Sequence, residues 1–204
     1  MHWGFHTKDT DIEDHVRTTL EGMAHGGIYD QIGGGFSRYS VDPRWHVPHF
    51  EKMLYDNGQL LSLYALGYAR FGNPEFLRIV TQTIGFLLRE LGHPKGGYYA
   101  SLDADSLTDE GELEEGAYYT WTENELRTIL GEDFDWAKEY YNINSFGHWE
   151  NGRYVLVRKL SDEEFASKME WTPGVLTEKV SGIQSALMDF REKKPRPRLD
   201  DKLI

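Results

Sequence analysis

The sequence contains no cysteine among its 204 residues. This absence excludes disulfides, thiolate metal sites and cysteine nucleophiles from the chain. Basic residues are also scarce, because 22 Lys and Arg stand against 34 Asp and Glu, which gives a formal net charge of -12. A surface that binds nucleic acid needs clustered Lys and Arg to neutralise phosphates, so we expect no nucleic-acid partner.

Long hydrophobic runs are missing as well. No segment approaches about 18 uninterrupted apolar residues, so we expect no membrane span and no membrane partner. The opening stretch MHWGFHTKDTDIEDHV has neither a basic start nor an apolar core, and it does not resemble a signal peptide. Together with the lack of disulfides, these features favour the cytoplasm.

Aromatic residues, in contrast, are abundant at 14 %, with 12 Tyr, 10 Phe and 6 Trp. Such side chains fill cores, and Tyr and Trp also line sites where an apolar ring and a polar tip are both useful. A chain of this length can bury a real core as one large domain or two small ones.

Apolar spacing and capping signals predict a mainly helical chain. Thr10 or Asp11 can cap the first helix, Pro48 suits the first position of the second, and Thr122 with Glu125 forms a capping-box pattern. The expected helices cover about residues 10–24, 48–71, 74–91, 134–140 and 173–192, with a short one after Thr122.

Two short antiparallel hairpins are expected between these helices. The first lies near residues 35–47, around the turn-like VDPR, and the second joins residues 98–102 to 117–121. Residues 152–160, GRYVLVRKL, are expected to be extended. Helices joined alternately by tight corners and long loops suggest an array of α-hairpins, either a solenoid or a closed α/α toroid. No repeat of about 30 to 50 residues is visible, which favours the toroid.

Several motifs occur in order along the chain: GGIYDQIGGGFSRYSVDPRWHVPHFEKMLYDN, GGYYASLDADS, EGAYYTWTENEL and the closing KPRPRLDDKLI. Over about residues 22–204 they resemble the YyaL-like, spermatogenesis-associated thioredoxin-domain-containing family. The resemblance implies a thioredoxin-like domain followed by an α/α toroid that is similar to N-acylglucosamine 2-epimerases and six-hairpin glycosidases.

The chain departs from that family pattern in extent. It lacks a C-x-x-C motif, and it ends on two apolar residues where the family continues through more toroid helices. We therefore expect residues 1–204 to form a single partial α/α-toroid domain, about half of an (α/α)6 barrel. This domain would be mainly α, with short β-hairpins in its loops, and the thioredoxin-like domain and the remaining toroid helices would be absent.

The stretch from Gly33 to Asn57 concentrates the candidate chemistry. Three consecutive glycines allow positive φ and close backbone approach, either for a tight structural turn or for a loop around a ligand. If a helix begins at Pro48, His49, Lys52 and Asp56 share one line of it, and Glu51 and Tyr55 form a neighbouring line. This polar surface would be one wall of a pocket.

The two histidines of this stretch have competing interpretations. His46 and His49 could act as acid and base, or could have packing and capping roles. H-x-x-H with a proline inside is not a helical metal pair, so no metal is expected. Arg38 could hold a carboxylate, a phosphate or a sugar hydroxyl, or could pair with Asp42, Glu51 or Asp56.

Carboxylates recur later in the chain. Asp103 and Asp105 follow a strand and should point to one side of it, as a glycosidase-type pair would. A calcium loop that includes Asp109 and Glu114 is disfavoured, because Thr108 stands where such a loop needs glycine. Asp200 and Asp201 beside Lys202 suit an ion-pair network or a hydroxyl-binding cluster.

The candidate catalytic residues are His46, His49, Glu51, Asp56, Asp103 and Asp105. The candidate substrate-binding residues are Arg38, Tyr39, Trp45, Lys52, Tyr55, Asn57, Trp121, Asp200 and Asp201. No cofactor is expected. The resemblance implies a sugar-binding or sugar-modifying protein, epimerase/isomerase-like or glycosidase-like in its full-length form. The alternative is a non-catalytic binding or scaffolding module. A carbohydrate or other small polar ligand is the expected partner, and half a toroid would also expose helix faces through which copies self-associate.

Overall fold

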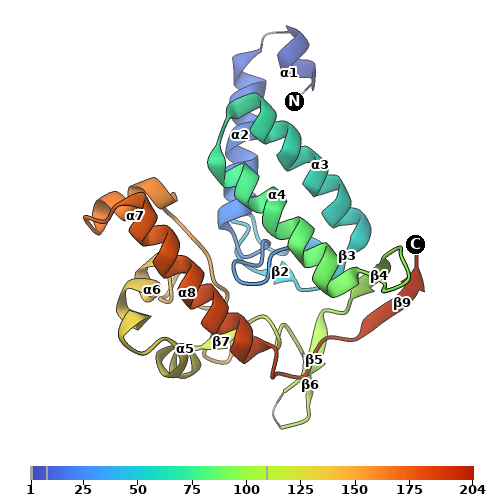
Figure 1. Cartoon of the computed structure of the whole chain (residues 1–204), viewed down its shortest axis with the longest axis vertical. Helices are drawn as coiled ribbons and strands as arrows, with labels where there is room; N and C mark the ends of the chain where they lie inside the picture. The colour runs from blue at the N-terminus through green and yellow to red at the C-terminus, as the bar shows by residue number, and fades with distance from the viewer. Residues whose placement is uncertain (1, 8, 109) are drawn as a thin grey trace.

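The computed structural model describes residues 2–7, 9–108 and 110–204, and the prediction of a mainly helical chain with short hairpins is confirmed (Figure 1). A π-helical turn, Leu87–Leu91, continues α4, and a 3-10 turn, Gly131–Asp133, precedes α6. The helices are α1 (His2–Thr7), α2 (Thr10–His25), α3 (Leu54–Phe71), α4 (Pro74–Phe86), α5 (Glu123–Leu130), α6 (Phe134–Tyr140), α7 (Asp162–Lys168) and α8 (Pro173–Arg191).

Local capping signals position most helix starts. Asp9, rather than the predicted Thr10 or Asp11, caps α2 by accepting hydrogen bonds from the next backbone amides. Asn73 caps α4 ahead of Pro74, and the predicted capping box of Thr122 and Glu125 opens α5.

The start of α3 corrects the sequence prediction. The helix begins at Leu54, because the residues before it are used in strands: β2 (Pro48–His49) pairs with β1 (Tyr39–Ser40), and β3 (Lys52–Met53) pairs with β4 (Tyr99–Leu102). The first expected hairpin is thus confirmed, with strands at 39–40 and 48–49. The expected helical line of His49, Lys52 and Asp56 does not exist.

The second expected hairpin is wrong. Strand β4 lies between β3 and the carboxyl-terminal β9 (Leu199–Leu203) instead of pairing with residues 117–121. Strand β5 (Asp105–Leu107) pairs instead with β6 (Leu113–Glu115). The end of the expected partner segment is used elsewhere, because β7 (Trp121–Thr122) pairs with β8 (Arg153–Tyr154).

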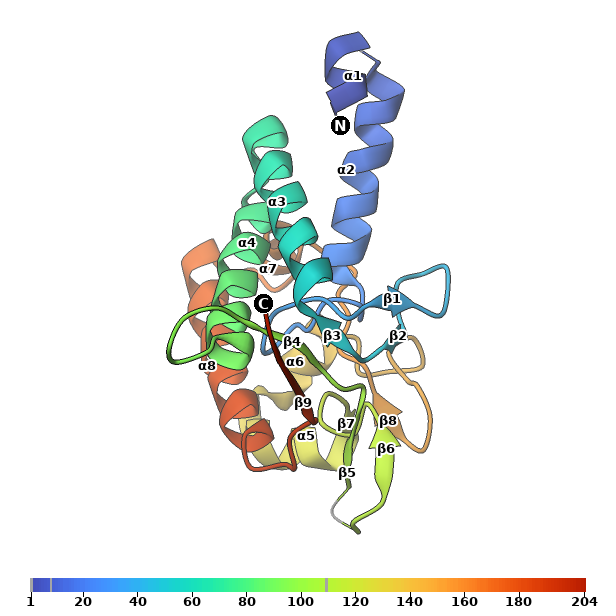
Figure 2. The same ribbon diagram turned by 90° about the vertical axis from the view of Figure 1, so that its right-hand side faces the viewer.

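Two helical groups flank the small sheets. Helices α1–α4 form one group and α5–α8 the other (Figure 1). The turned view shows β1, β2 and β3 near the ends of α2 and α3, and β5–β8 lower, beside α5 (Figure 2). Each group has its own apolar core: one is built around Leu20, Tyr64 and Phe76, and the other around Trp121 and Leu187. Among the described helices, none combines the length and hydrophobicity that a membrane crossing requires.

The glycine loop packs directly against α4. Gly34 and Gly35 have φ angles of +73° and +79°, in the left-handed region that side chains rarely adopt. A Cβ atom at Gly34 would lie 2.7 Å from the carbonyl oxygen of Gln82, and one at Gly35 would lie 2.5 Å from Cδ1 of Phe86. Both glycines are therefore needed for close helix contact.

Candidate functional site

A cleft of about 490 Å³ lies beside the three-stranded sheet β3–β4–β9. Four of the residues singled out from the sequence line it together: Glu51, Asp103, Asp200 and Asp201. Strand pairing explains this convergence, because Ser101 on β4 lies opposite Asp200 on β9. Two motifs almost one hundred residues apart thus meet at one sheet edge.

The cleft is strongly acidic. Among the described residues that line it, Arg198 is the one cation. Its Nε lies 3.8 Å from Oδ2 of Asp103. The Arg198 side chain is 87 % exposed, so water screens this pair and it holds the carboxylate only weakly. The cleft therefore offers several carboxylate oxygens to a ligand from solvent.

Glu51 connects the cleft to a second polar group. Its Oε2 accepts a hydrogen bond of 3.0 Å from Arg38, and this bond raises the pKa of the Arg38 guanidinium. The His49 ring lies 3.9 Å from the same oxygen through Nε2 and 2.8 Å from Oε1 of Glu115 through Nδ1. The exposed ring of Tyr39 stacks on His49 at 5.0 Å.

Asp56 lies in the first turn of α3, within electrostatic reach of Arg38 and Glu51. Burial raises the pKa of its carboxyl group against the pull of Arg38. Its Oδ2 is buried and has no hydrogen-bond partner among the described residues. Tyr55, at the preceding position, is half exposed.

The other predicted residues lie away from the cleft. Asn57 is fully buried, where its side chain bonds both the N–H and the carbonyl of Phe36 and so fastens the glycine loop to α3. Trp121 belongs to the core of the second helical group. Asp105 lies on β5, opposite Glu115.

The residues around the first hairpin also separate. His46 is buried and stacks on Phe146 at 5.9 Å, and burial lowers the pKa of its imidazole. Trp45 packs beside the core of the first helical group with a left-handed φ of 60°. Neither side chain lines the acidic cleft.

Lys52, the first residue of β3, points away from the cleft that its neighbour Glu51 lines. It is buried, and its Nζ lies 2.8 Å from Oδ2 of Asp30. Arg191, at the end of α8, contacts the same oxygen at 2.7 Å. Burial alone would raise the pKa of Asp30, but the two cations hold it far below the usual range.

Asp30 and Arg191 were not predicted from the sequence as site residues. They are 161 positions apart, and no local spacing links them. The available signal was an acidic residue just before a glycine run, which by itself specifies no partner.

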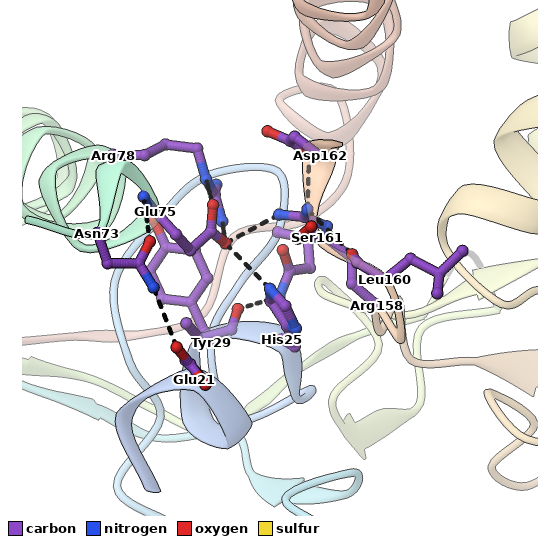
Figure 3. Close-up of polar contacts among 12 residues, drawn as sticks. Glu21, His25, Tyr29, Asn73, Glu75, Arg78, Arg158, Leu160, Ser161 and Asp162 are labelled. Atoms are coloured by element: carbon purple, nitrogen blue, oxygen red, sulfur yellow. Dashed lines mark hydrogen bonds and ion pairs between the residues drawn. The ribbon is translucent and has the colours of Figure 1, made fainter. Parts of the chain in front are cut away.

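A larger cavity, of about 700 Å³, lies between α2, the start of α4 and the segment leading into α7. Its polar floor is shown in Figure 3. Glu75 accepts hydrogen bonds from Arg78 at 2.6 and 2.9 Å and from Arg158 at 2.9 Å, while Nε2 of His25 lies 3.6 Å away. Arg158 also donates to Asp162 at 2.6 Å.

The electrostatics of this cavity floor differ from those of the cleft. Burial lowers the pKa of His25 to about 4, helped by the charge of Arg158, so the imidazole is neutral near pH 7. Burial would raise the pKa of Glu75, but Arg78 and Arg158 lower it to about 2. Because the carboxylate is saturated by these cations, it serves to join the two helical groups. Sequence reasoning singled out none of these residues.

Metal-binding geometry is not found at either place. Within residues 2–7, 9–108 and 110–204, no group of three or more His, Asp or Glu side chains is arranged to hold a metal ion. The calcium alternative included Asp109, which lies outside the described residues.

These features define a mainly helical chain with an acidic cleft beside its three-stranded sheet. No protein-family model matches the sequence. The chain is 36 % identical over 93 % of its length to an uncharacterized protein of Caenorhabditis elegans. It is 35 % identical over 91 % of its length to human spermatogenesis-associated protein 20, and 33 % identical over 91 % to the mouse protein of that name.

These matches relate the chain to the spermatogenesis-associated protein 20 family. The chain spans about a quarter of the length of these relatives, with 28 % of the nematode protein and 26 % of each mammalian one covered.

Proposed function

We propose that the cleft lined by Glu51, Asp103, Asp200 and Asp201 binds a carbohydrate or another small polyhydroxylated ligand. The convergence of these carboxylates on one cleft supports this proposal: Glu51 directly precedes β3, Asp103 directly follows β4, and Asp200 and Asp201 lie on β9. Carboxylate oxygens accept hydrogen bonds from ligand hydroxyls, and Arg198 on the rim can donate one in return. A volume of about 490 Å³ is also in the range of small-molecule sites.

The neighbouring aromatic surface fits the same ligand class. Tyr39 is 49 % exposed, and its stacking on His49 places the ring next to Glu51. An exposed aromatic face beside hydrogen-bonding groups suits a sugar, which has both an apolar ring face and polar hydroxyls.

In the full-length proteins of the family, we propose that this cleft also takes part in a sugar-modifying reaction, epimerase/isomerase-like or glycosidase-like. The family resemblance and the presence of several carboxylates in one cleft support this extension. Paired carboxylates are the groups that glycoside chemistry uses as acid, base or nucleophile.

A second candidate function is a non-catalytic binding or scaffolding module. The observation that favours it is the pairing of two predicted groups with neighbours inside the chain: His49 with Glu115, and Arg38 with Glu51. Side chains held in this way contribute to the local structure and are less free to bind a ligand.

Titration of the chain with a panel of monosaccharides, followed by amide NMR, tests the proposal. A bound sugar should shift the amide signals of residues 101–103 and 198–201. Asp103→Asn or Asp201→Asn should weaken binding by about tenfold or more, since a hydrogen bond to a charged group contributes about 1.5–3 kcal/mol. Glu178→Gln, at an exposed position on α8, is the matched control and should bind normally.

The stability of each variant is measured by urea unfolding in the same buffer. The cleft variants should unfold within about 0.5 kcal/mol of wild type, as surface substitutions usually do. If no sugar in the panel shifts these amides while all variants remain folded, the scaffolding function is the correct one.

A further inference from the structure

A small cavity lies between the glycine loop, the π-helical turn after α4 and the end of α8, away from the acidic cleft. Its volume is about 10 Å³, which limits the occupant to a single small species. Its charged lining, within the described residues, consists of four cations and two carboxylates: Lys52, Arg89, Arg191, Arg196, Asp30 and Glu90.

The buried part of this lining carries excess positive charge. Lys52 and Arg191, each with a side chain only 2 % exposed, share one oxygen of Asp30. The other carboxylate oxygen of Asp30, Oδ1, accepts hydrogen bonds from the backbone amides of Ile32 and Gly33, so it is not available to a further cation. Two buried cations thus face a single carboxylate.

The second carboxylate does not remove this excess. Glu90 is paired with two arginines, Arg89 and Arg196, whose side chains are 39 % and 48 % exposed. Burial lowers the pKa of the Lys52 ammonium to about 8, in spite of the neighbouring Asp30. An additional negative charge at this place would stabilise the protonated lysine.

Three residues of this lining carry hydrogen-bond donors that are not used. Arg191 Nε and the hydroxyls of Tyr118 and Tyr119 are buried and have no hydrogen-bond partner among the described residues. Burial raises the pKa of both tyrosines, so their hydroxyls keep their protons near neutral pH. A buried donor left without an acceptor costs about 1–3 kcal/mol, so an acceptor in the cavity would be strongly favoured.

From this combination we infer that the cavity binds one small monovalent anion of halide size, with chloride as the physiological candidate. An anion accepts hydrogen bonds from the two tyrosine hydroxyls and from Arg191, and it also offsets the buried positive charge. A water molecule would satisfy the donors without offsetting the charge. Phosphate or sulfate, with four oxygens, is too large for about 10 Å³.

Thermal unfolding in different sodium salts at one ionic strength tests this inference. Chloride and bromide should raise the melting temperature relative to gluconate, and the rise should grow with halide concentration, because a ligand that binds only the folded state stabilises it. Tyr118→Phe removes one donor and should reduce this halide dependence. Tyr68→Phe, at an exposed position on α3, should leave it unchanged.

A bromide-soaked crystal of the wild-type chain gives a direct readout that does not depend on any variant. An anomalous peak between Tyr118, Tyr119 and Arg191 would support the anion site. Equal melting temperatures in chloride and gluconate, together with no bromide peak in the cavity, would overturn it and leave water as the occupant.

Discussion

The ammonium of Lys52 lies 2.8 Å from Oδ2 of Asp30, and the guanidinium of Arg191 lies 2.7 Å from the same oxygen. These three residues come from β3, from the loop after α2 and from the last turn of α8. Through this one oxygen, the glycine loop of the first helical group is joined to the long helix of the second.

Asp30→Asn should therefore be strongly destabilising. The substitution leaves two buried cations without a counter-charge, and breaking a buried pair in this way costs about 3–5 kcal/mol. Guanidinium-induced unfolding measures the loss. Glu139→Gln breaks the exposed pair with Lys168 and should cost less than about 1 kcal/mol, so equal effects of the two substitutions would contradict the structure.

Two glycine substitutions should act in opposite directions. Gly35→Ala forces an alanine to a φ of +79° and brings its Cβ to 2.5 Å from Cδ1 of Phe86. The left-handed conformation alone costs about 1–2 kcal/mol, and the clash adds to it. Gly58→Ala lies in α3 with nothing within 4 Å of the new Cβ, and should stabilise by about 0.5–1 kcal/mol.

Chemical denaturation of both alanine variants decides this prediction. If Gly35→Ala were as stable as wild type, the loop would not need its close contact with α4. A destabilised Gly58→Ala would show that α3 is more crowded at that position than its surroundings indicate.

The helices were predictable from the sequence because their signals are local. Asn73 ahead of Pro74, and Thr122 with Glu125, mark helix starts within one turn. The start of α3 was not predictable in this way, because Pro48 fits a helix start equally well. The place of Pro48 in β2 depends on its pairing with Ser40, eight positions earlier.

The candidate site was predicted in part for the same reason. Asp103 and Asp200 were identified from their motifs, yet their meeting depends on β4 pairing with β9, which no local pattern indicates. Glu51 and Lys52 were assigned to one polar surface under a helical period. In the structure the two side chains point to different places, Glu51 to the cleft and Lys52 to Asp30.

Self-association through helix faces stays a prediction, and the structure indicates which face to test. Leu77, Ile84 and Leu88 are 43 %, 43 % and 60 % exposed along one side of α4 and its π-helical turn, and Thr81 lies between them. This stripe carries no charge, whereas the chain as a whole has a net charge of -12. A second copy can meet it with little electrostatic repulsion.

Leu88→Glu should therefore lower the apparent mass of the chain in light scattering at high concentration, because it places a charge in the contact. Leu203→Glu, at another exposed apolar position on β9, is the control. A wild-type chain that remains monomeric at the highest concentration tested would contradict this prediction.

The last prediction concerns acid stability, which depends on the partly buried His25. Its pKa is lowered from 6.5 to about 4 by burial, with Arg158 and Arg78 acting in the same direction and Glu75 and Asp162 against it. Between these two pH values the unfolded chain binds a proton at this histidine that the folded chain does not. The free energy of unfolding must therefore fall as the pH falls from 6.5 towards 4, by on the order of 3 kcal/mol over the whole window.

Urea unfolding at a series of pH values across this window tests the relation. His25→Gln removes the titrating ring and should flatten the decline, whereas His15→Gln, an exposed position on the same helix, should retain it. Glu75, whose pKa is lowered to about 2, adds a separate loss below about pH 4.5, as its carboxylate is protonated on unfolding. A decline that is as steep in His25→Gln as in wild type would show that other groups cause it, and that the His25 ring is not held neutral against Glu75.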